Sequence, residues 1–196
     1  MADLGTPAKI KAIFFDFFGV ISLARHQLFF ETTIPNYHKR RLELEDLGRQ
    51  HDLGLITTDQ YLYELSMATG MSAKQCLDQM RSQRVTNEPL LNYIKDQLKP
   101  NYKIGMISNA GGDVKEYIDK KYWSIFDTVV ISCEVGVIKP DPLIFEIACQ
   151  RLNVTPSQAV LVDDTQDNCD GAKSAGMVPI LYTTLQDMQS EFKKIL

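Results

Sequence analysis

The sequence has no excess of positive charge and no long apolar run. Its 21 basic and 25 acidic residues give a formal charge of −4, which disfavours binding to nucleic acids or anionic membranes. The most apolar early stretch, Ile10–Ile21, is interrupted by Lys11 and Asp16 and is too short to cross a bilayer core of about 30 Å. Met1–Ala8 lacks the basic start and the apolar stretch of a signal peptide. These absences point to a small molecule as the partner, with no membrane or nucleic acid involved.

The sequence is also poor in cysteine. Its four cysteines form no Cys-x-x-Cys pair and have no spacing typical of a metal site. A chain of 196 residues with 44% hydrophobic content can bury a core without disulfides. We therefore expect one catalytic unit with a modest insert, in the reducing environment of the cytoplasm.

Five short segments rich in β-branched and aromatic residues are spread along the chain. The first, Ile10–Phe15, has the continuous apolar character of a strand that is covered on both faces of a parallel sheet. Four similar segments follow: Tyr102–Ile107, Thr128–Ile131, Ala159–Val162 and Val178–Leu181. The clearest helix between them is Asp141–Leu152, with Asp141 as its N-cap and Pro142 at its first position. Alternating strands and helices predict an α/β fold with a doubly wound parallel sheet.

The alternation stops between residues 22 and 87, where the pattern is helical throughout. Thr57–Gln60 and Ser72–Gln75 both match the capping box that begins a helix, and Gly70 is placed to end the helix between them. We therefore predict a catalytic core made of residues 1–21 and 88–196. Residues 22–87 are expected to form a small all-helical cap, inserted after the first strand.

Reactive side chains follow four of the predicted strands. They are Asp16 after the first strand, Ser108 and Asn109 after the second, Lys139 in the segment after the third, and Asp163 and Asp164 after the fourth. Ligands of open α/β sheets bind beyond the carboxyl ends of the strands. We therefore expect these residues, which are far apart in the sequence, to meet at one edge of the sheet.

The charged members of this set fit the transfer of a phosphoryl group. Asp16 and Asp164 can bind Mg²⁺ through oxygen, and Asp163 can act through a bound water. A carboxylate that attacks a phosphate dianion is repelled by it. The cation and Lys139 are therefore needed to offset that charge before Asp16 can approach in line. We also expect Lys139 to keep Asp16 ionised.

Ser108 and Asn109 lie where the phosphoryl oxygens would be held. The hydroxyl of Ser108 and the backbone N–H groups of residues 109–112, at the start of the next helix, can donate to those oxygens. Taken singly, each of these polar residues has an ordinary explanation as a turn or helix-start residue. Asn168 likewise either bonds a metal-binding carboxylate or caps its helix. The function is indicated by the whole set.

In this order the residues resemble the four signature motifs of the haloacid dehalogenase superfamily, and the likeness covers nearly the whole chain. Residues 160–177, with the Asp163–Asp164 pair followed by Asn168 and Gly171, resemble the phosphatase and epoxide-hydrolase-associated members in particular. The likeness is closest to small bacterial sugar-phosphate phosphatases, such as the glucose-1-phosphate phosphatases, whose helical cap also follows the first motif. The resemblance implies Asp16 as the nucleophile, an aspartyl-phosphate intermediate, bound Mg²⁺ and a small phosphorylated metabolite as substrate.

One position departs from the pattern of these phosphatases. Members with phosphatase activity usually carry a second aspartate two residues after the nucleophile, where it protonates the leaving group and later activates water. Here that residue is Phe18, which can offer its backbone carbonyl to the metal but cannot transfer a proton. Losing a general acid and base costs about 10² to 10⁴ in rate. We therefore expect a slow enzyme, a preference for good leaving groups, or another proton donor, although some sugar-phosphate phosphatases also lack this aspartate.

Two other functions are compatible with these residues. The dehalogenases of the superfamily carry an aromatic residue at the position of Phe18, and their aspartate attacks carbon. They work without a metal and have neutral groups in place of Asp163 and Asp164, whose charges would repel one another without a cation. A phosphatase is therefore favoured over a 2-haloacid dehalogenase. The third possibility is a binding or regulatory protein that keeps the fold without efficient turnover.

Two features of the predicted cap are candidates for a part in the reaction. His26 lies after the first motif, and an unperturbed histidine titrates near neutral pH, so it is a candidate proton donor. Residues 38–41, with the sequence His-Lys-Arg-Arg, could meet an anionic part of the substrate. The plainer interpretations, a packing histidine and a solvated helix face, are favoured for both.

Overall fold

The computed structural model describes residues 8–23, 26–112, 114 and 120–196. Within these residues the chain forms a five-stranded parallel sheet in the order β3-β2-β1-β4-β5. The strands are β1 (Ala12–Phe15), β2 (Lys103–Ser108), β3 (Thr128–Ile131), β4 (Ala159–Asp163) and β5 (Val178–Leu181). They coincide with the five predicted segments apart from small differences at their ends. The predicted α/β fold with a parallel sheet is confirmed.

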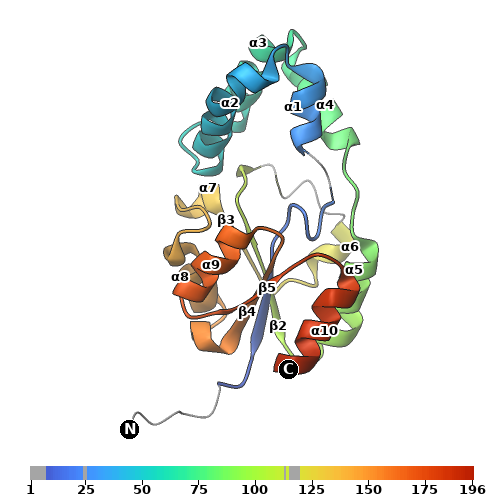
Figure 1. Ribbon diagram of the computed structural model, residues 1–196, viewed down its shortest axis with the longest axis vertical. Coiled ribbons are helices and arrows are strands. Elements are labelled where there is room, and N and C mark those ends of the chain that lie inside the picture. The colour runs from blue at the N-terminus through green and yellow to red at the C-terminus, as the bar shows by residue number, and fades with distance from the viewer. Residues whose placement is uncertain (1–7, 24–25, 113, 115–119) are drawn as a thin grey trace.

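Helices cover both faces of this sheet (Figure 1). Side chains alternate along a strand, so Ile13 and Phe15 of β1 enter one apolar layer while Ala12 and Phe14 enter the other. The helices of the first layer are α5 (Glu88–Tyr93), the π-helical turn η1 (Ile94–Leu98), α6 (Lys120–Trp123) and α10 (Leu185–Ile195). Those of the second layer are α8 (Pro142–Arg151) and α9 (Gln166–Ser174). Because both faces are covered, β1 needs the continuous apolar run seen in the sequence.

Local signals in the sequence set the ends of several helices. The side chain of Asp141 accepts from the backbone N–H of Leu143 at 2.9 Å, and Pro142 occupies the first position of α8, as predicted. Two further short elements complete the core: α7 (Ser132–Val135) and the 3₁₀ turn η3 (Pro156–Gln158). Among the described helices, none is long and apolar enough to cross a membrane.

Between β1 and α5 the described chain is helical. The helices are α1 (His26–Thr33), α2 (Tyr37–Asp52), α3 (Thr58–Thr69) and α4 (Ala73–Ser82). Both predicted capping boxes form, and Gly70 ends α3 in the left-handed conformation with φ 75°. These helices share an apolar cluster of their own, with Phe29, Leu65 and Cys76 fully buried. Figure 1 shows them stacked beyond the end of the sheet that is remote from both chain termini. The division into core and cap at residues 22 and 87 stays a prediction.

Candidate active site

Four reactive side chains lie at the carboxyl edge of the sheet. Asp16 follows β1 directly, Ser108 ends β2 and Asp163 ends β4. β1 pairs with both β2 and β4, so these three residues stand at the ends of neighbouring strands. Lys139 comes from the loop between α7 and α8. The structure therefore brings together residues that are far apart in the sequence.

Lys139 lies between two buried carboxylates. Its Nζ is 2.7 Å from Oδ1 of Asp16 and 2.6 Å from Oδ2 of Asp163. The side chains of Lys139 and Asp163 are 1% and 0% exposed. Because solvent does not screen charges at this depth, removing Lys139 would leave two buried carboxylates without a counter-charge. Both carboxylates therefore depend on the ammonium group.

The side chain of Asn109 holds the backbone of Lys139. Its Nδ2 donates to the carbonyl oxygen of Lys139 at 2.9 Å, and its Oδ1 accepts from the N–H of Lys139 at 2.7 Å. This two-point contact ties the end of β2 to the loop that carries the ammonium group. The sequence predicted Asn109 for the phosphoryl oxygens. Because its side-chain amide bonds the backbone of Lys139, only the backbone N–H of Asn109 would be free to contact a phosphoryl oxygen.

Asp163 is held in place through both of its carboxylate oxygens. Oδ1 accepts from the backbone N–H of Thr165 and from Nδ2 of Asn168, each at 3.0 Å. Oδ2 accepts from Nζ of Lys139 at 2.6 Å. Of the two interpretations of Asn168, the hydrogen bond to a carboxylate is the one that the structure shows. The last residue of β4 thus has a fixed orientation before any ligand binds.

Asp16, Asp163 and Asp164 form the one potential metal-binding group found within the described residues. One carboxylate oxygen from each of the three lies within 4.8 Å of the other two. Gly19 permits this approach, because its φ is +82° and a Cβ there would lie 2.0 Å from Oδ2 of Asp164. Three carboxylates and the one ammonium of Lys139 leave a formal charge of −2. A divalent cation would balance that charge.

The pKa values of these groups reflect the crowding of charge. Burial raises the pKa of Asp16 to about 7. The attraction of Lys139 lowers this pKa, whereas the repulsion of Asp163 raises it further. Burial and the charge of Asp163 also raise the pKa of Asp164. Burial lowers the pKa of Lys139, but the two carboxylates outweigh this effect and the net shift is upward. Lys139 therefore stays protonated, and a bound cation would lower the cost of keeping the carboxylates charged.

The hydroxyl of Ser108 has no partner of its own. Its Oγ is buried, and within the described part of the chain it makes no hydrogen bond. Leaving a buried hydroxyl unpaired costs free energy, so such groups in proteins are nearly always paired. A phosphoryl oxygen bound at the end of β2 would supply the missing partner.

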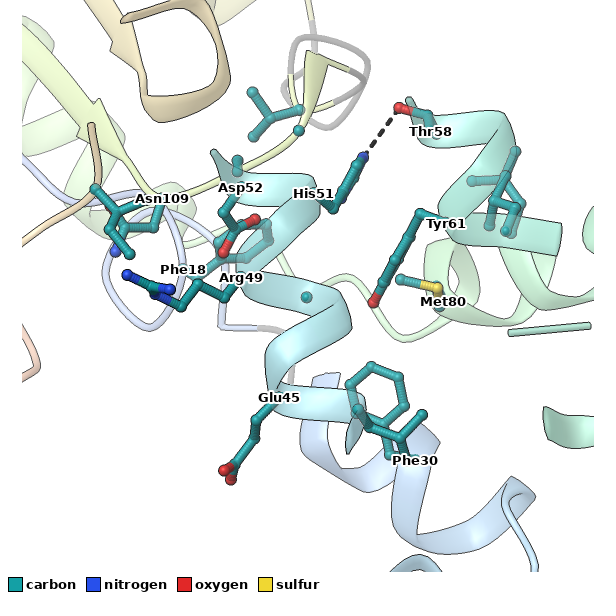
Figure 2. Close-up of a pocket in the computed structure, with 18 of the residues that line it drawn as sticks. Phe18, Phe30, Glu45, Arg49, His51, Asp52, Thr58, Tyr61, Met80 and Asn109 are labelled. Carbon is teal, nitrogen blue, oxygen red and sulfur yellow. Dashed lines mark hydrogen bonds between the residues drawn. The ribbon is translucent and has the colours of Figure 1, made fainter. Parts of the chain in front are cut away.

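A cavity of about 540 Å³ lies between the helices α2 and α3 and this edge of the sheet (Figure 2). Its wall on the sheet side includes Phe18, Asn109 and Ile138. In the sequence, Asn109 and Ile138 are adjacent to Ser108 and Lys139, and Phe18 is two residues after Asp16. Sites for small molecules in proteins have volumes of about 300 to 1,000 Å³. The cavity is thus large enough for a substrate that reaches from the buried charges towards the helices.

A family model for haloacid dehalogenase-like hydrolases matches residues 10–176. That range contains the carboxylates, Lys139, Ser108 and the helices α1 to α4. The chain belongs to the haloacid dehalogenase-like hydrolase family. It is therefore a hydrolase built on the parallel core of that family, as the sequence predicted.

Two curated relatives of this hydrolase are much longer than the segment that it matches. Over 155 residues it is 29% identical to acyl-CoA dehydrogenase family member 10 of Mus musculus, covering 73% of this chain and 14% of that protein. Over 136 residues it is 26% identical to bifunctional epoxide hydrolase 2 of Mus musculus, covering 66% of this chain and 24% of that protein. The chain thus spans less than a quarter of the length of these two relatives.

Solved structures of family members share the fold of this hydrolase. A HAD family enzyme of Bacteroides thetaiotaomicron superposes with a TM-score of 0.82 at 21% identity, covering 94% of this chain and 99% of that one. A 2-haloacid dehalogenase of Pseudomonas syringae superposes with a TM-score of 0.58 at 24% identity, covering 88% and 86%. The helices α1 to α4 are part of the first superposition, since it spans almost the whole of both chains.

The two cap features singled out in the sequence have different outcomes. The side chain of His26 lies outside the residues that the structure describes. In the cluster at residues 38–41, Arg40 pairs with Glu43 at 2.7 Å and Arg41 with Glu45 at 3.5 Å, on the exposed face of α2. Arg40 fits the favoured interpretation of a solvated helix face, whereas Arg41 also lines the cavity described above.

Sequence reasoning missed the contact between α2 and the loop after β2. His51 is buried, stacks on Tyr61 with ring centroids 4.4 Å apart, and has Nε2 3.1 Å from Oγ1 of Thr58. A Cβ at Gly111 would lie 2.1 Å from this imidazole, so only a glycine allows the ring to pack there. The Gly-Gly pair after Asn109 was the sole signal of this approach in the sequence.

The substitution Asp16→Asn should stabilise the metal-free hydrolase at about pH 8. The pKa of Asp16 is about 7 in the folded chain against an ordinary value of 3.8, so the folded state binds a proton that the unfolded state has lost. Wild-type stability therefore falls as the pH rises between these values, and asparagine removes that loss. Urea unfolding in EDTA should show a gain on the order of 1 kcal/mol or more near pH 8 that shrinks near pH 4. An equal difference at both pH values would contradict this.

Proposed function

We propose that this hydrolase is a Mg²⁺-dependent phosphatase that cleaves a small phosphomonoester through an aspartyl-phosphate intermediate. The observation that carries the proposal is the buried Lys139 between Asp16 and Asp163, with the carboxylate of Asp164 beside them. This arrangement combines a nucleophile, a fixed cation and oxygen ligands for a metal at one edge of the sheet. Residues 22–87 would act as the cap that closes over a small phosphorylated metabolite.

In the first step the carboxylate of Asp16 attacks the phosphorus atom, and the ester oxygen leaves with its bonding electrons. The ammonium of Lys139 is 2.7 Å from Oδ1 of Asp16, so it orients the nucleophile and reduces its repulsion from the phosphate. The unpaired hydroxyl of Ser108 donates to a phosphoryl oxygen. In the second step water attacks the phosphorus atom, which releases phosphate and restores Asp16.

The donor set suits Mg²⁺. Mg²⁺ in proteins usually takes one or two carboxylates together with waters and phosphate oxygens. Asp16 and Asp164 would hold it, with the backbone carbonyl of Phe18 as a third ligand and Asp163 acting through a water. When bound, the ion would neutralise charge on the phosphoryl oxygens as a Lewis acid. Its two positive charges match the formal −2 of the four side chains.

Several relatives support a phosphate ester as the substrate. The glyceraldehyde 3-phosphate phosphatase of Methanopyrus kandleri is 42% identical over 83 residues, which cover 40% of this chain and 35% of that protein. The Bacteroides thetaiotaomicron enzyme has also been solved in complex with magnesium and inorganic phosphate, with a TM-score of 0.78 at 20% identity, covering 93% of this chain and 99% of that one. Both names agree with the chemistry of the residues described above.

Dehalogenation is the second candidate, and Phe18 is the observation that favours it. This aromatic residue resembles that of the superfamily's dehalogenases and cannot donate a proton. Its ring packs edge-on against that of Phe17, with the ring centroids 4.8 Å apart. The three carboxylates argue against it, because they would repel one another in a metal-free enzyme.

Phosphate release should depend on Mg²⁺. We expect the wild-type chain to release phosphate from p-nitrophenyl phosphate with Mg²⁺, to lose this activity in EDTA, and to release no chloride from 2-chloropropionate. Asp16→Asn should abolish the phosphate release while circular dichroism shows an intact fold. Chloride release that persists in EDTA would identify a dehalogenase, and phosphate release by a folded Asp16→Asn variant would exclude the proposed nucleophile.

Asp164→Ala should weaken the dependence on Mg²⁺. Because even the residues that hydrogen-bond a metal ligand typically contribute about 10- to 100-fold to metal affinity, losing a direct ligand should raise the Mg²⁺ concentration needed for half-maximal activity by at least about 10-fold. Asp167→Ala is the matched control, because Asp167 is exposed in the first turn of α9 and is not a member of the metal-binding group. Magnesium titrations of phosphate release that coincide for Asp164→Ala and the wild type would rule out this role.

Phe18→Asp should restore a proton donor on the side of the leaving group. We expect kcat/KM for alkyl phosphates, which need protonation, to rise by about 10²-fold, with little change for p-nitrophenyl phosphate. Phe18→Asn has nearly the same shape without the acid, so it serves as the control. A similar gain for both variants would show that the size of residue 18, and not its proton, limits the reaction.

A further inference from the structure

The cavity between α2, α3 and the sheet extends beyond the residues that carry the proposed chemistry. Asp16, Ser108 and Lys139 are buried and do not line it, whereas Phe18 and Asn109 do. A phosphoryl group held by the buried residues would therefore direct its leaving group past Phe18 into the cavity. The residues of the outer wall determine which leaving group fits there.

Arg49 is the unusual member of that outer wall. On the same helix, Arg40 pairs with Glu43, and Arg41, which also lines the cavity, pairs with Glu45. Arg49 forms no ion pair with any residue of the described chain. Figure 2 shows its guanidinium extending towards Phe18 and Asn109. An unpaired guanidinium thus lies on the route of the leaving group.

Within the described chain, neither acidic residue of the wall, Glu45 or Asp52, forms an ion pair with Arg49. Figure 2 shows Glu45 pointing away from Phe18, and its carboxylate pairs with Arg41. Asp52 lines the cavity as well, but it makes contacts of its own. Most of the remaining wall is apolar: Phe18, Phe30, Tyr61, Leu62, Met80 and Ile138. Among the described residues, a ligand of this cavity therefore meets a largely apolar surface with two guanidinium groups, of which Arg41 has an acidic partner and Arg49 has none.

The position of Arg49 is fixed by contacts between α2 and the core. Oγ of Ser132, at the start of α7, donates to the backbone carbonyl of Asp52 at 2.5 Å. The ring of His51 packs against Gly111, where a Cβ would not fit. Both contacts lie within one helical turn of Arg49. The backbone that carries the guanidinium is therefore held against the sheet before a substrate binds.

We propose that Arg49 binds a second anionic group, carried by the leaving group of the substrate. This inference rests on the proposed phosphatase function and narrows its substrate class to phosphomonoesters with an apolar body and an anionic oxygen group. A guanidinium offers a planar pair of N–H donors that matches a carboxylate or a phosphate. The transferred phosphoryl group does not need this cation, because Lys139 already faces Asp16.

Three aryl phosphates test the proposal: phenyl phosphate, 4-carboxyphenyl phosphate and 1,4-phenylene bisphosphate. The aromatic ring is common to all, so the comparison isolates the second anionic group. We expect wild-type kcat/KM to favour at least one anionic ester over phenyl phosphate, and Arg49→Gln to reduce that preference on the order of 10-fold, chiefly through KM. Arg49→Lys should retain part of it. Arg40→Gln, on the same helix but outside the cavity wall, should retain all of it.

The ratio between wild type and Arg49→Gln cancels the intrinsic reactivity of each ester. If Arg49→Gln lowers kcat/KM equally for all three, the inference is wrong and the phosphatase proposal stands. If no ester releases phosphate, the phosphatase proposal fails, and calorimetric titration of the esters into Asp16→Asn decides the inference separately. Tighter binding of an anionic ester that is lost on adding Arg49→Gln supports it, whereas equal binding of the three esters, or none, overturns it.

Discussion

The ammonium of Lys139, held between the buried carboxylates of Asp16 and Asp163, is the interaction on which the rest of the site depends. A charge at this depth is stable only where its partners are fixed, and the fold fixes all of them. Asn109, after the end of β2, hydrogen-bonds the backbone of Lys139, and Asn168 of α9 hydrogen-bonds the carboxylate of Asp163. Much of the carboxyl edge is thus organised around one cation.

The strands, the helix ends and the meeting of the charged residues could be predicted from the sequence, whereas individual side-chain contacts could not. The strands could be predicted because a strand covered on both faces must be apolar, and the helix ends because capping is local. Asp16, Lys139 and Asp163 could be placed together because parallel strands end at one edge. The role of Asn109 could not, since the hydrogen bonds of its amide to the backbone of Lys139 depend on the path of the loop between α7 and α8. Arg49 could not either, because the side of α2 that faces the sheet is set by packing with the core.

Two environments meet at Phe18. On one side lie the buried charges, which suit a phosphate and a divalent cation, and on the other lies an apolar cavity of about 540 Å³ under the cap helices. A phenylalanine at this position extends the apolar wall up to the reacting atoms and removes the usual proton donor. The phosphoryl group would thus be bound among charged side chains, and the leaving group would lie against apolar ones.

The most direct test of this account is to identify the atom that accepts the phosphoryl group. Turnover of p-nitrophenyl phosphate with Mg²⁺ would be quenched in acid within the first cycle, and the peptides analysed by mass spectrometry. The account predicts a phosphoryl group on the peptide that contains Asp16, at the side chain of that residue. A chain that releases phosphate while this peptide stays unmodified, or that carries the phosphoryl group elsewhere, would contradict it.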